Sequence, residues 1–428
     1  MGGKLSFTCI NSYAIPTYRV MRHTLLSFIK DSSYVVIGAG LSLLCNYFFH
    51  FYVSRALGPK DYGVYNALLS FSLLLTLPFG AISLAVANET VRLEKEKISD
   101  YIRQLLFFNI TFAVFLFVLL LINIKWISTF LHIDNPLLIL ITFLIPVISL
   151  FPSILIGVLQ GLQFFKPYAL VTTSVQLFRL VFGVILVILG LKVFGALLGS
   201  ILGAVAGLML LLFSIRSYLS WPPFKRKGER IKQTIKKSLS YLGYTGAFFS
   251  LMYVDVPLVR HFFTAQETGF YSAAALLGKV PVYLIGSMGM VIFPKVVEMR
   301  RQNQAHFRFF TIALFIVLVL LTIIAISYIL LAKLVVKMLF GSAYIPAVPL
   351  VKHFGLSAIP LTLASVTVRY FIGIEKRRFL YLVWLCALGF VVSFCLFHPM
   401  PDWAIWWLGL WSFLIIVSVF VGNLFFKD

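Results

Sequence analysis

Long apolar runs of about 20 residues, separated by short polar segments, make up most of the chain. A run of this length crosses the hydrocarbon core of a bilayer as one helix. About twelve can be drawn, at 33–54, 64–87, 105–124, 137–158, 168–190, 193–214, 240–262, 271–293, 308–330, 347–372, 379–397 and 403–425. The pattern predicts an all-α polytopic membrane protein whose loops are too short to form a separate folded domain.

Composition agrees with this fold class. The chain is 61% hydrophobic and only 12% charged, which is too apolar for a soluble domain. The net charge of +22 does not indicate nucleic-acid binding, because the bases lie mostly in short loops between the apolar runs. The four cysteines lack metal-ligand spacing. We therefore expect no disulfide framework, no metal, no cofactor and no nucleic acid partner.

The bases are distributed unequally between alternate loops. The loops that share a side with the N-terminus carry most of them: Arg92, Lys95, Lys97, Arg103, seven bases at 225–237, Arg300, Arg301 and Lys376 to Arg378. The other loops have only scattered ones. By the positive-inside rule, both termini are expected in the cytoplasm.

Two sequence correspondences predict that the halves of the chain repeat. Residues 58–71 align with 264–277 at a shift of 206, and the sequence around Gly161 aligns with that around Gly373. The first pairs Asp61 with Glu267, Gly63 with Gly269, Tyr65 with Tyr271 and Ala67 with Ala273. Six spans per half is an even number, so the two lobes have the same orientation and usually enclose a central pathway.

The expected organisation follows from the repeat and from the loop charges. It has a cytoplasmic N-terminal segment at 1–32, an N-lobe of six transmembrane helices at 33–214, a basic cytoplasmic linker at 215–239 and a C-lobe of six at 240–428. The basic linker is expected to rest against anionic lipid head groups.

Four bases lie inside predicted spans, whereas only one acid does: the bases are Arg179, Lys279, Lys352 and Arg369, and the acid is Asp255. A charge at the bilayer centre costs roughly 2.5 to 3.5 kcal/mol on insertion scales, so such residues normally face a cavity or a partner. One carboxylate does not neutralise four cations. The imbalance indicates a cavity whose missing negative charge arrives with a ligand.

Arg179 is the strongest candidate for binding that ligand. Gln176 lies three residues before it on the same helix face, so a guanidinium and an amide lie side by side, which suits phosphate or sugar hydroxyls. The alternative is a hydrogen bond to a neighbouring helix. Asn46 and His50 share a polar face of the first span, facing either the pathway or another helix.

The remaining intramembrane charges have two readings each. Asp255 either binds a coupling cation or proton, or orients a cationic side chain in the cavity, or forms a structural ion pair, for which Lys279 at similar depth is the expected partner. Lys279 is also expected to bind the ligand together with Arg179. Lys352 and Arg369 either contact substrate or extend to the head groups, since both lie near span ends.

Arg55 and Arg260 end spans one and seven at corresponding places in the repeat, as outer gates or interface anchors. No phosphate-binding loop of the GxxxxGK[ST] type and no Ser/His/Asp grouping is present. We therefore assign no catalytic residues and do not expect an enzyme.

Two segments carry a family resemblance. SRALGPKDYGVYNALLSF is similar to the signature R-x-LGP-x-x-[FY]-G-x-[YF], and YVDVPLVRHFFTAQETGFYSAA resembles a second motif in which Asp255, Gly269, Tyr271 and Ala273 take the recurrent places. On these motifs, residues 30–426 resemble the Wzx-type polysaccharide transporters, the oligosaccharide flippases of the multidrug/oligosaccharidyl-lipid/polysaccharide exporter superfamily.

The resemblance implies a multi-pass flippase of the inner membrane that acts in surface polysaccharide biosynthesis. By alternating access it would move a polyprenyl-diphosphate-linked oligosaccharide from the cytoplasmic to the outer leaflet. It implies a cationic cavity between the lobes, with glycosyltransferases and a polymerase of the same pathway as partners. The alternatives are an ion-coupled small-molecule exporter, a membrane glycan polymerase or ligase, and a scaffold that does not transport.

Overall fold

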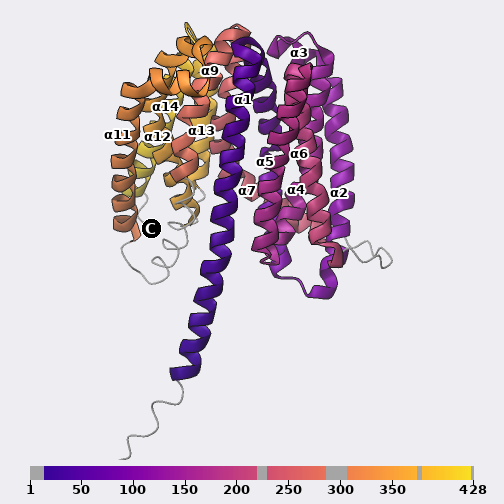
Figure 1. Ribbon diagram of the computed structural model, residues 1–428. Helices are drawn as coiled ribbons and strands as arrows, with labels where there is room; N and C mark the ends of the chain where they lie inside the picture. Colours follow the sequence, from indigo (N-terminus) through magenta and orange to yellow (C-terminus); the bar gives the residue numbers. More distant parts are fainter. Residues whose placement is uncertain (1–13, 219–228, 286–305, 374–377, 426–428) are drawn as a thin grey trace, which may run out of the picture.

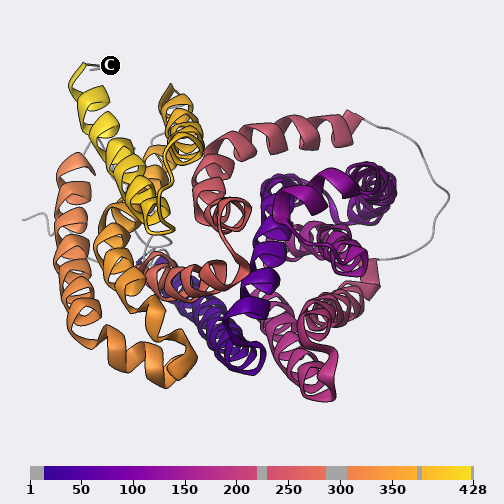
Figure 2. The ribbon, with the colours of Figure 1, turned by 90° about the horizontal axis from the view of Figure 1, so that it is seen from above.

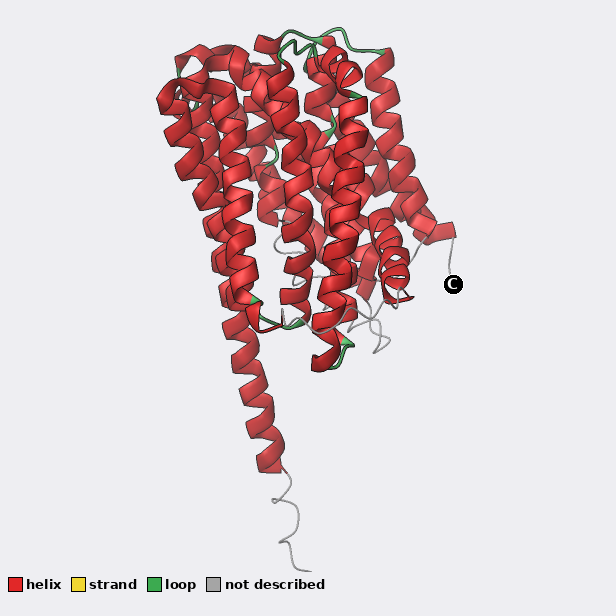
Figure 3. Ribbon diagram, turned by 90° about the vertical axis from the view of Figure 1, so that its right-hand side faces the viewer, coloured by secondary structure: helices red, strands yellow, loops and turns green. Residues whose placement is uncertain are grey.

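The computed structural model describes residues 14–218, 229–285, 306–373 and 378–425. Every regular element within these ranges is a helix, as Figure 3 shows, which confirms the all-α prediction. Seven described helical stretches are long and apolar enough to cross a membrane, or eight if one bent pair is a single span. Two of them, 33–91 and 165–214, are 59 and 50 residues long. The number of twelve spans stays a prediction.

The N-lobe contains α1 (Ala14–Val91), α2 (Lys95–Ile122), the short α3 (Ile124–Leu131), α4 (Pro136–Gly161), α5 (Phe165–Leu186) and α6 (Lys192–Ser214), with η1 (Val187–Leu191) and η2 (Arg216–Tyr218) beside α6. Helix α1 includes both of the first two predicted spans. Gly58 separates them with φ 72° and ψ 173°, in the left-handed range of φ that glycine adopts most easily. Pro59 then begins the second half, a first-turn position where its missing N–H costs no hydrogen bond.

The C-lobe contains α7 (Glu229–Tyr253), α8 (Asp255–Phe262), α9 (Ala265–Gly278), α11 (His306–Leu339), η3 (Ser342–Ala347), α12 (Val348–Gly373), α13 (Arg378–Leu396) and α14 (Trp403–Phe425). Helix α7 begins inside the predicted linker. The chain bends by 56° between residues 230–243 and 246–262, so the predicted seventh span is a broken one. Residues 286–293 of the predicted eighth span lie outside the described residues.

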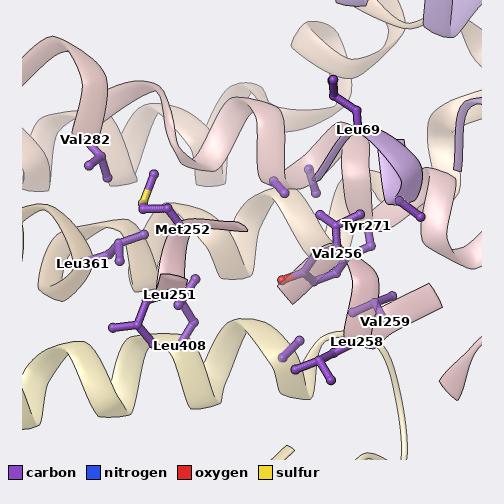
Figure 4. Packing of buried hydrophobic residues seen from close by; sticks show 14 of the residues in the cluster. Leu69, Leu251, Met252, Val256, Leu258, Val259, Tyr271, Val282, Leu361 and Leu408 are labelled. Atoms are coloured by element: carbon purple, nitrogen blue, oxygen red, sulfur yellow. The ribbon is translucent and has the colours of Figure 1, made fainter. Parts of the chain in front are cut away.

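Helix α1 lies between two groups of helices (Figures 1 and 2). It packs against α4 and α5 on one side and against α7 and α9 on the other. One cluster of buried apolar residues includes side chains from both lobes. Figure 4 shows part of it, where Leu69 of α1 approaches Val256 and Tyr271 of the C-lobe.

The second half of α1 crosses α9 at the two glycines of the repeat, and we call this contact the glycine crossing. A Cβ atom on Gly63 would overlap the carbonyl oxygen of Ala265, and one on Gly269 would overlap that of Pro59. Pro59 and Ala265 are separated by the same 206 residues as the two glycines. The contact is therefore reciprocal, which places the pseudo-two-fold axis of the lobes at this crossing.

Candidate functional site

At one end of the molecule, two arginines join the lobes in a reciprocal way. Arg55 of the N-lobe donates to the carbonyl oxygen of Met338, in the last turn of α11. Arg260 of the C-lobe donates to the carbonyl oxygen of His132 at 2.7 Å, the residue that ends α3. Helix C-termini carry partial negative charge and attract cations. We call these two contacts the arginine latch.

Further contacts reinforce the closure at this end. The Nδ1 atom of His261 lies 2.9 Å from the carbonyl oxygen of Phe130, and the His261 ring stacks on the Phe130 ring at 4.4 Å between centroids. Because a carbonyl only accepts, Nδ1 carries the proton. The Tyr344 hydroxyl donates to the Ser54 carbonyl oxygen at 2.9 Å. The two lobes therefore touch through hydrogen bonds and through the glycine crossing on this side.

A buried cationic cluster lies within the N-lobe, where Arg179 of α5 reaches α1. Arg179 is 9% exposed. Its guanidinium donates to Asn46 Oδ1 at 3.0 Å and to the Tyr65 hydroxyl at 2.7 Å, and lies 4.5 Å from the centroid of the Phe49 ring. His50 Nε2 is 3.4 Å away. These partners carry no negative charge, and no carboxylate of the described residues forms an ion pair with Arg179.

The hydrogen bonds fix the protonation state of His50. A guanidinium only donates, so Nε2 of His50 accepts, and Nδ1–H donates to the Tyr62 hydroxyl at 3.1 Å. His50 is therefore neutral beside Arg179. Among the described residues, several buried polar atoms have no hydrogen-bond partner, and they include Nε of Arg179 and the side-chain oxygen of Gln176 as well as Oδ1 of Asp255 and Nε of Arg260. Buried polar atoms without partners are uncommon in folded proteins and are consistent with a ligand-binding role.

The C-lobe holds a charged cluster with a different balance. Lys279 Nζ lies 2.7 Å from Asp255 Oδ2 and also donates to the Met252 carbonyl oxygen at 2.7 Å. The Tyr271 hydroxyl donates to the same carboxylate oxygen at 2.9 Å. Asp255 is fully buried and Lys279 is 6% exposed. The ion pair has no net charge, and it ties α9 to the break between α7 and α8.

One tyrosine of the repeat serves each cluster. Tyr65 accepts from Arg179, and Tyr271, its counterpart 206 residues later, donates to Asp255. Both side chains are fully buried. The repeat pairs these tyrosines, but neither was predicted as a site residue. An identical polar residue at equivalent positions of the two halves is the signal that could have indicated them.

Two of the cations singled out in the sequence lie at different depths on α12. The Tyr271 ring is 5.5 Å from that of Phe354, so Lys352 is within one turn of the level of the Asp255 cluster, but its side chain is exposed. Arg369 is half-buried and lies fifteen residues beyond Phe354, roughly 22 Å along the helix axis. Contact of a ligand with Lys279, Lys352 or Arg369 stays a prediction.

Replacing Lys279 with methionine is expected to destabilise the protein by roughly 3–5 kcal/mol, because it leaves the Asp255 carboxylate buried without a counter-charge. Adding Asp255→Asn should restore most of the melting temperature in detergent, since the double variant has no buried charge at this place. An equally unstable double variant would contradict the ion pair's role as a compensated structural contact.

Comparisons with known proteins place these features in a family. Residues 28–300 match the family model described as "Polysaccharide biosynthesis protein". No curated protein sequence matches the chain. An inward-facing multidrug resistance transporter of the MATE family, in the MOP superfamily, aligns with TM-score 0.72 and 16% identity, covering 90% of this chain and 93% of that one.

Two further structures share the fold. The lipid II flippase MurJ in an inward closed conformation aligns with TM-score 0.70 and 14% identity, over 92% of this chain and 87% of that one. An outward-facing MATE transporter gives TM-score 0.63 and 18% identity, over 93% and 94%. The all-α membrane fold of this superfamily is therefore the fold of the chain.

Proposed function

Because the chain belongs to the family of polysaccharide biosynthesis proteins, we propose that it is a flippase for a polyprenyl-diphosphate-linked oligosaccharide. The protein moves this lipid from the cytoplasmic to the outer leaflet by alternating access of its two lobes. It acts in the cytoplasmic membrane with both termini in the cytoplasm, and enzymes that build and polymerise the glycan precede and follow it.

Alternating access is supported by the reciprocal contacts that close one end of the molecule. The arginine latch consists of two equivalent arginines, each of which binds a carbonyl oxygen at the end of a helix in the opposite lobe. These contacts involve only a few hydrogen bonds at helix ends, so they can open without unfolding either lobe.

The Arg179 cluster supports an anionic substrate. A buried guanidinium surrounded by neutral groups has no carboxylate to compete with a diphosphate oxygen. Charge-assisted hydrogen bonds between arginine and phosphate are strong because the planar guanidinium presents two parallel donors. Both Nε of Arg179 and the Gln176 oxygen are buried in this conformation. In this proposal they become accessible when the lobes move, and they then donate to the diphosphate and accept from a sugar hydroxyl.

The other charged residues take different roles in this proposal. The Asp255–Lys279 pair holds the bend of the C-lobe and supplies no net charge to the pathway. Lys352 and Arg369, at opposite ends of α12, contact the diphosphate before and after the lobes move. Arg55 and Arg260 form the outer gate.

The direct test uses the purified protein in proteoliposomes loaded with a polyprenyl-diphosphate-linked oligosaccharide. A glycosidase that cannot cross the membrane should reach substrate from the opposite leaflet only when the protein is present. Unchanged accessibility would overturn the proposal. Ion-driven export of a cationic dye would instead favour the small-molecule exporter, and extension of the glycan would favour a polymerase.

A further inference from the structure

An apolar pocket lies between α1, α2 and the first half of α7, away from both charged clusters. Its volume is about 170 Å³. The lining is almost entirely apolar and includes Phe108 and Phe112 of α2 and Ile231, Ile235 and Leu239 of α7. Leu239 and Ile235 are 66% and 38% exposed, so the pocket opens on an apolar surface of the protein. An apolar cavity in that position takes up a hydrocarbon chain rather than water.

The first half of α7 is fixed to the N-lobe beside this pocket. Tyr101 and Thr234 share a hydrogen bond of 2.8 Å, and Lys237 forms an ion pair with Glu89. Beyond these contacts the chain bends by 56° and enters the C-lobe. The pocket thus lies where the chain passes from one lobe to the other, and a molecule bound in it lies next to the element that must flex when the lobes move.

Positively charged residues beside the pocket favour lipids with a strongly negative head group. Arg230 and Lys232 flank the lining residue Ile231, and Lys236 follows the lining residue Ile235. Lys232 and Lys236 are exposed. A diphosphate carries more negative charge than the head group of a phospholipid, so the exposed Lys232 and Lys236 favour a lipid diphosphate at short range. Together with Lys97, Arg230 lies close enough to Glu94 to help lower the pKa of that carboxyl. In the proposed orientation these cations lie at the cytoplasmic head-group level.

We infer that this pocket binds the polyprenyl tail of the lipid-linked glycan while its diphosphate is still in the cytoplasmic leaflet. The site is therefore an entry site for the tail, formed by α1, α2 and α7, and it rests on the proposed function. A short part of the branched isoprenoid chain fills the space among Phe108, Phe112 and Ile235. The diphosphate then meets Lys232 and Lys236 before it reaches Arg179.

The test measures binding of undecaprenyl diphosphate to the full-length protein in detergent by native mass spectrometry. Ile235→Trp fills the pocket and should weaken this binding at least about tenfold, because it excludes several carbons whose burial contributes to affinity. Ile110→Trp is the matched control, since Ile110 is 53% exposed on α2 and does not line the pocket. It should bind like the wild type. A soluble analogue with a methyl group in place of the tail should bind both variants equally.

Each contrary outcome has a distinct meaning. Equal binding of undecaprenyl diphosphate by the two tryptophan variants would overturn the tail site and leave the proposed function intact. If Ile235→Trp weakens the binding of phosphatidylglycerol as much as that of undecaprenyl diphosphate, the tail site is also overturned, since the pocket would then hold any membrane lipid. If the wild-type protein itself shows no saturable binding of undecaprenyl diphosphate, the proposed function fails. Melting temperatures of the two variants within a few degrees of each other verify that Ile235→Trp acts on the pocket and not on the fold.

Discussion

Replacing Arg179 with glutamine is expected to abolish translocation of the lipid-linked glycan in proteoliposomes. In the proposed complex, Arg179 and the diphosphate form a buried, hydrogen-bonded charge pair. Truncating one partner of such a pair typically costs about 2–5 kcal/mol, which corresponds to a loss of at least roughly thirtyfold in binding. Glutamine retains hydrogen-bonding capacity toward Asn46 and Tyr65 but lacks the charge that attracts a diphosphate. The measurement is the rate at which substrate becomes accessible to the glycosidase in the opposite leaflet, taken at several substrate concentrations.

Two further variants separate charge from fold. Arg179→Lys keeps the charge but loses the planar fork, so it should retain a small fraction of the rate. Arg216→Gln makes the same chemical change at an exposed arginine that stacks on Phe213, and it should be as active as the wild type. Full activity of Arg179→Gln at a normal melting temperature would remove Arg179 from the substrate site.

Replacing Gly63 or Gly269 with valine is expected to prevent closure of the outer end. Each new side chain would overlap a backbone carbonyl of the opposite helix, and backbone on both sides of the glycine crossing cannot move aside without separating the lobes. The variants should therefore be held open to the outside and translocate at background rates. Because the contact is reciprocal, the two single variants should have the same phenotype.

Thiol labelling measures that change of conformation. In a background without Cys9, Cys45, Cys386 and Cys395, a cysteine at Ser54 is fully buried in the closed form and should react with an impermeant maleimide only in the valine variants. Gly80→Val is the control, because a Cβ at Gly80 of the same helix meets no other atom within 4 Å. Unlabelled Ser54→Cys in Gly63→Val would show that the glycine crossing does not govern closure. The double variant Arg55→Gln, Arg260→Gln should increase labelling to a smaller extent.

The apolar runs and the repeat allowed much of the fold to be predicted. Intramembrane helices must satisfy their backbone hydrogen bonds internally, so a run of apolar residues has few structural alternatives. The repeat at 58–71 and 264–277 placed Gly63 and Gly269 at equivalent positions, and Lys279 was expected beside Asp255 because both lie at similar depth. The positions of kinks and helix starts were harder to predict. Gly58 kinks α1 although the helix continues on both sides of it, and α7 begins within the expected linker.

By itself, the sequence determined the fold class, the equivalence of the two halves and the excess of cations over acids within the predicted spans. These depend on composition and on spacing along the chain. Only the tertiary structure decided which cation lacks a counter-charge. Lys279 is neutralised by a residue 24 positions away, whereas the partners of Arg179 lie more than 100 positions away and are all uncharged. It also decided that the matched glycines touch each other, since contact across a pseudo-two-fold axis depends on how the lobes pack.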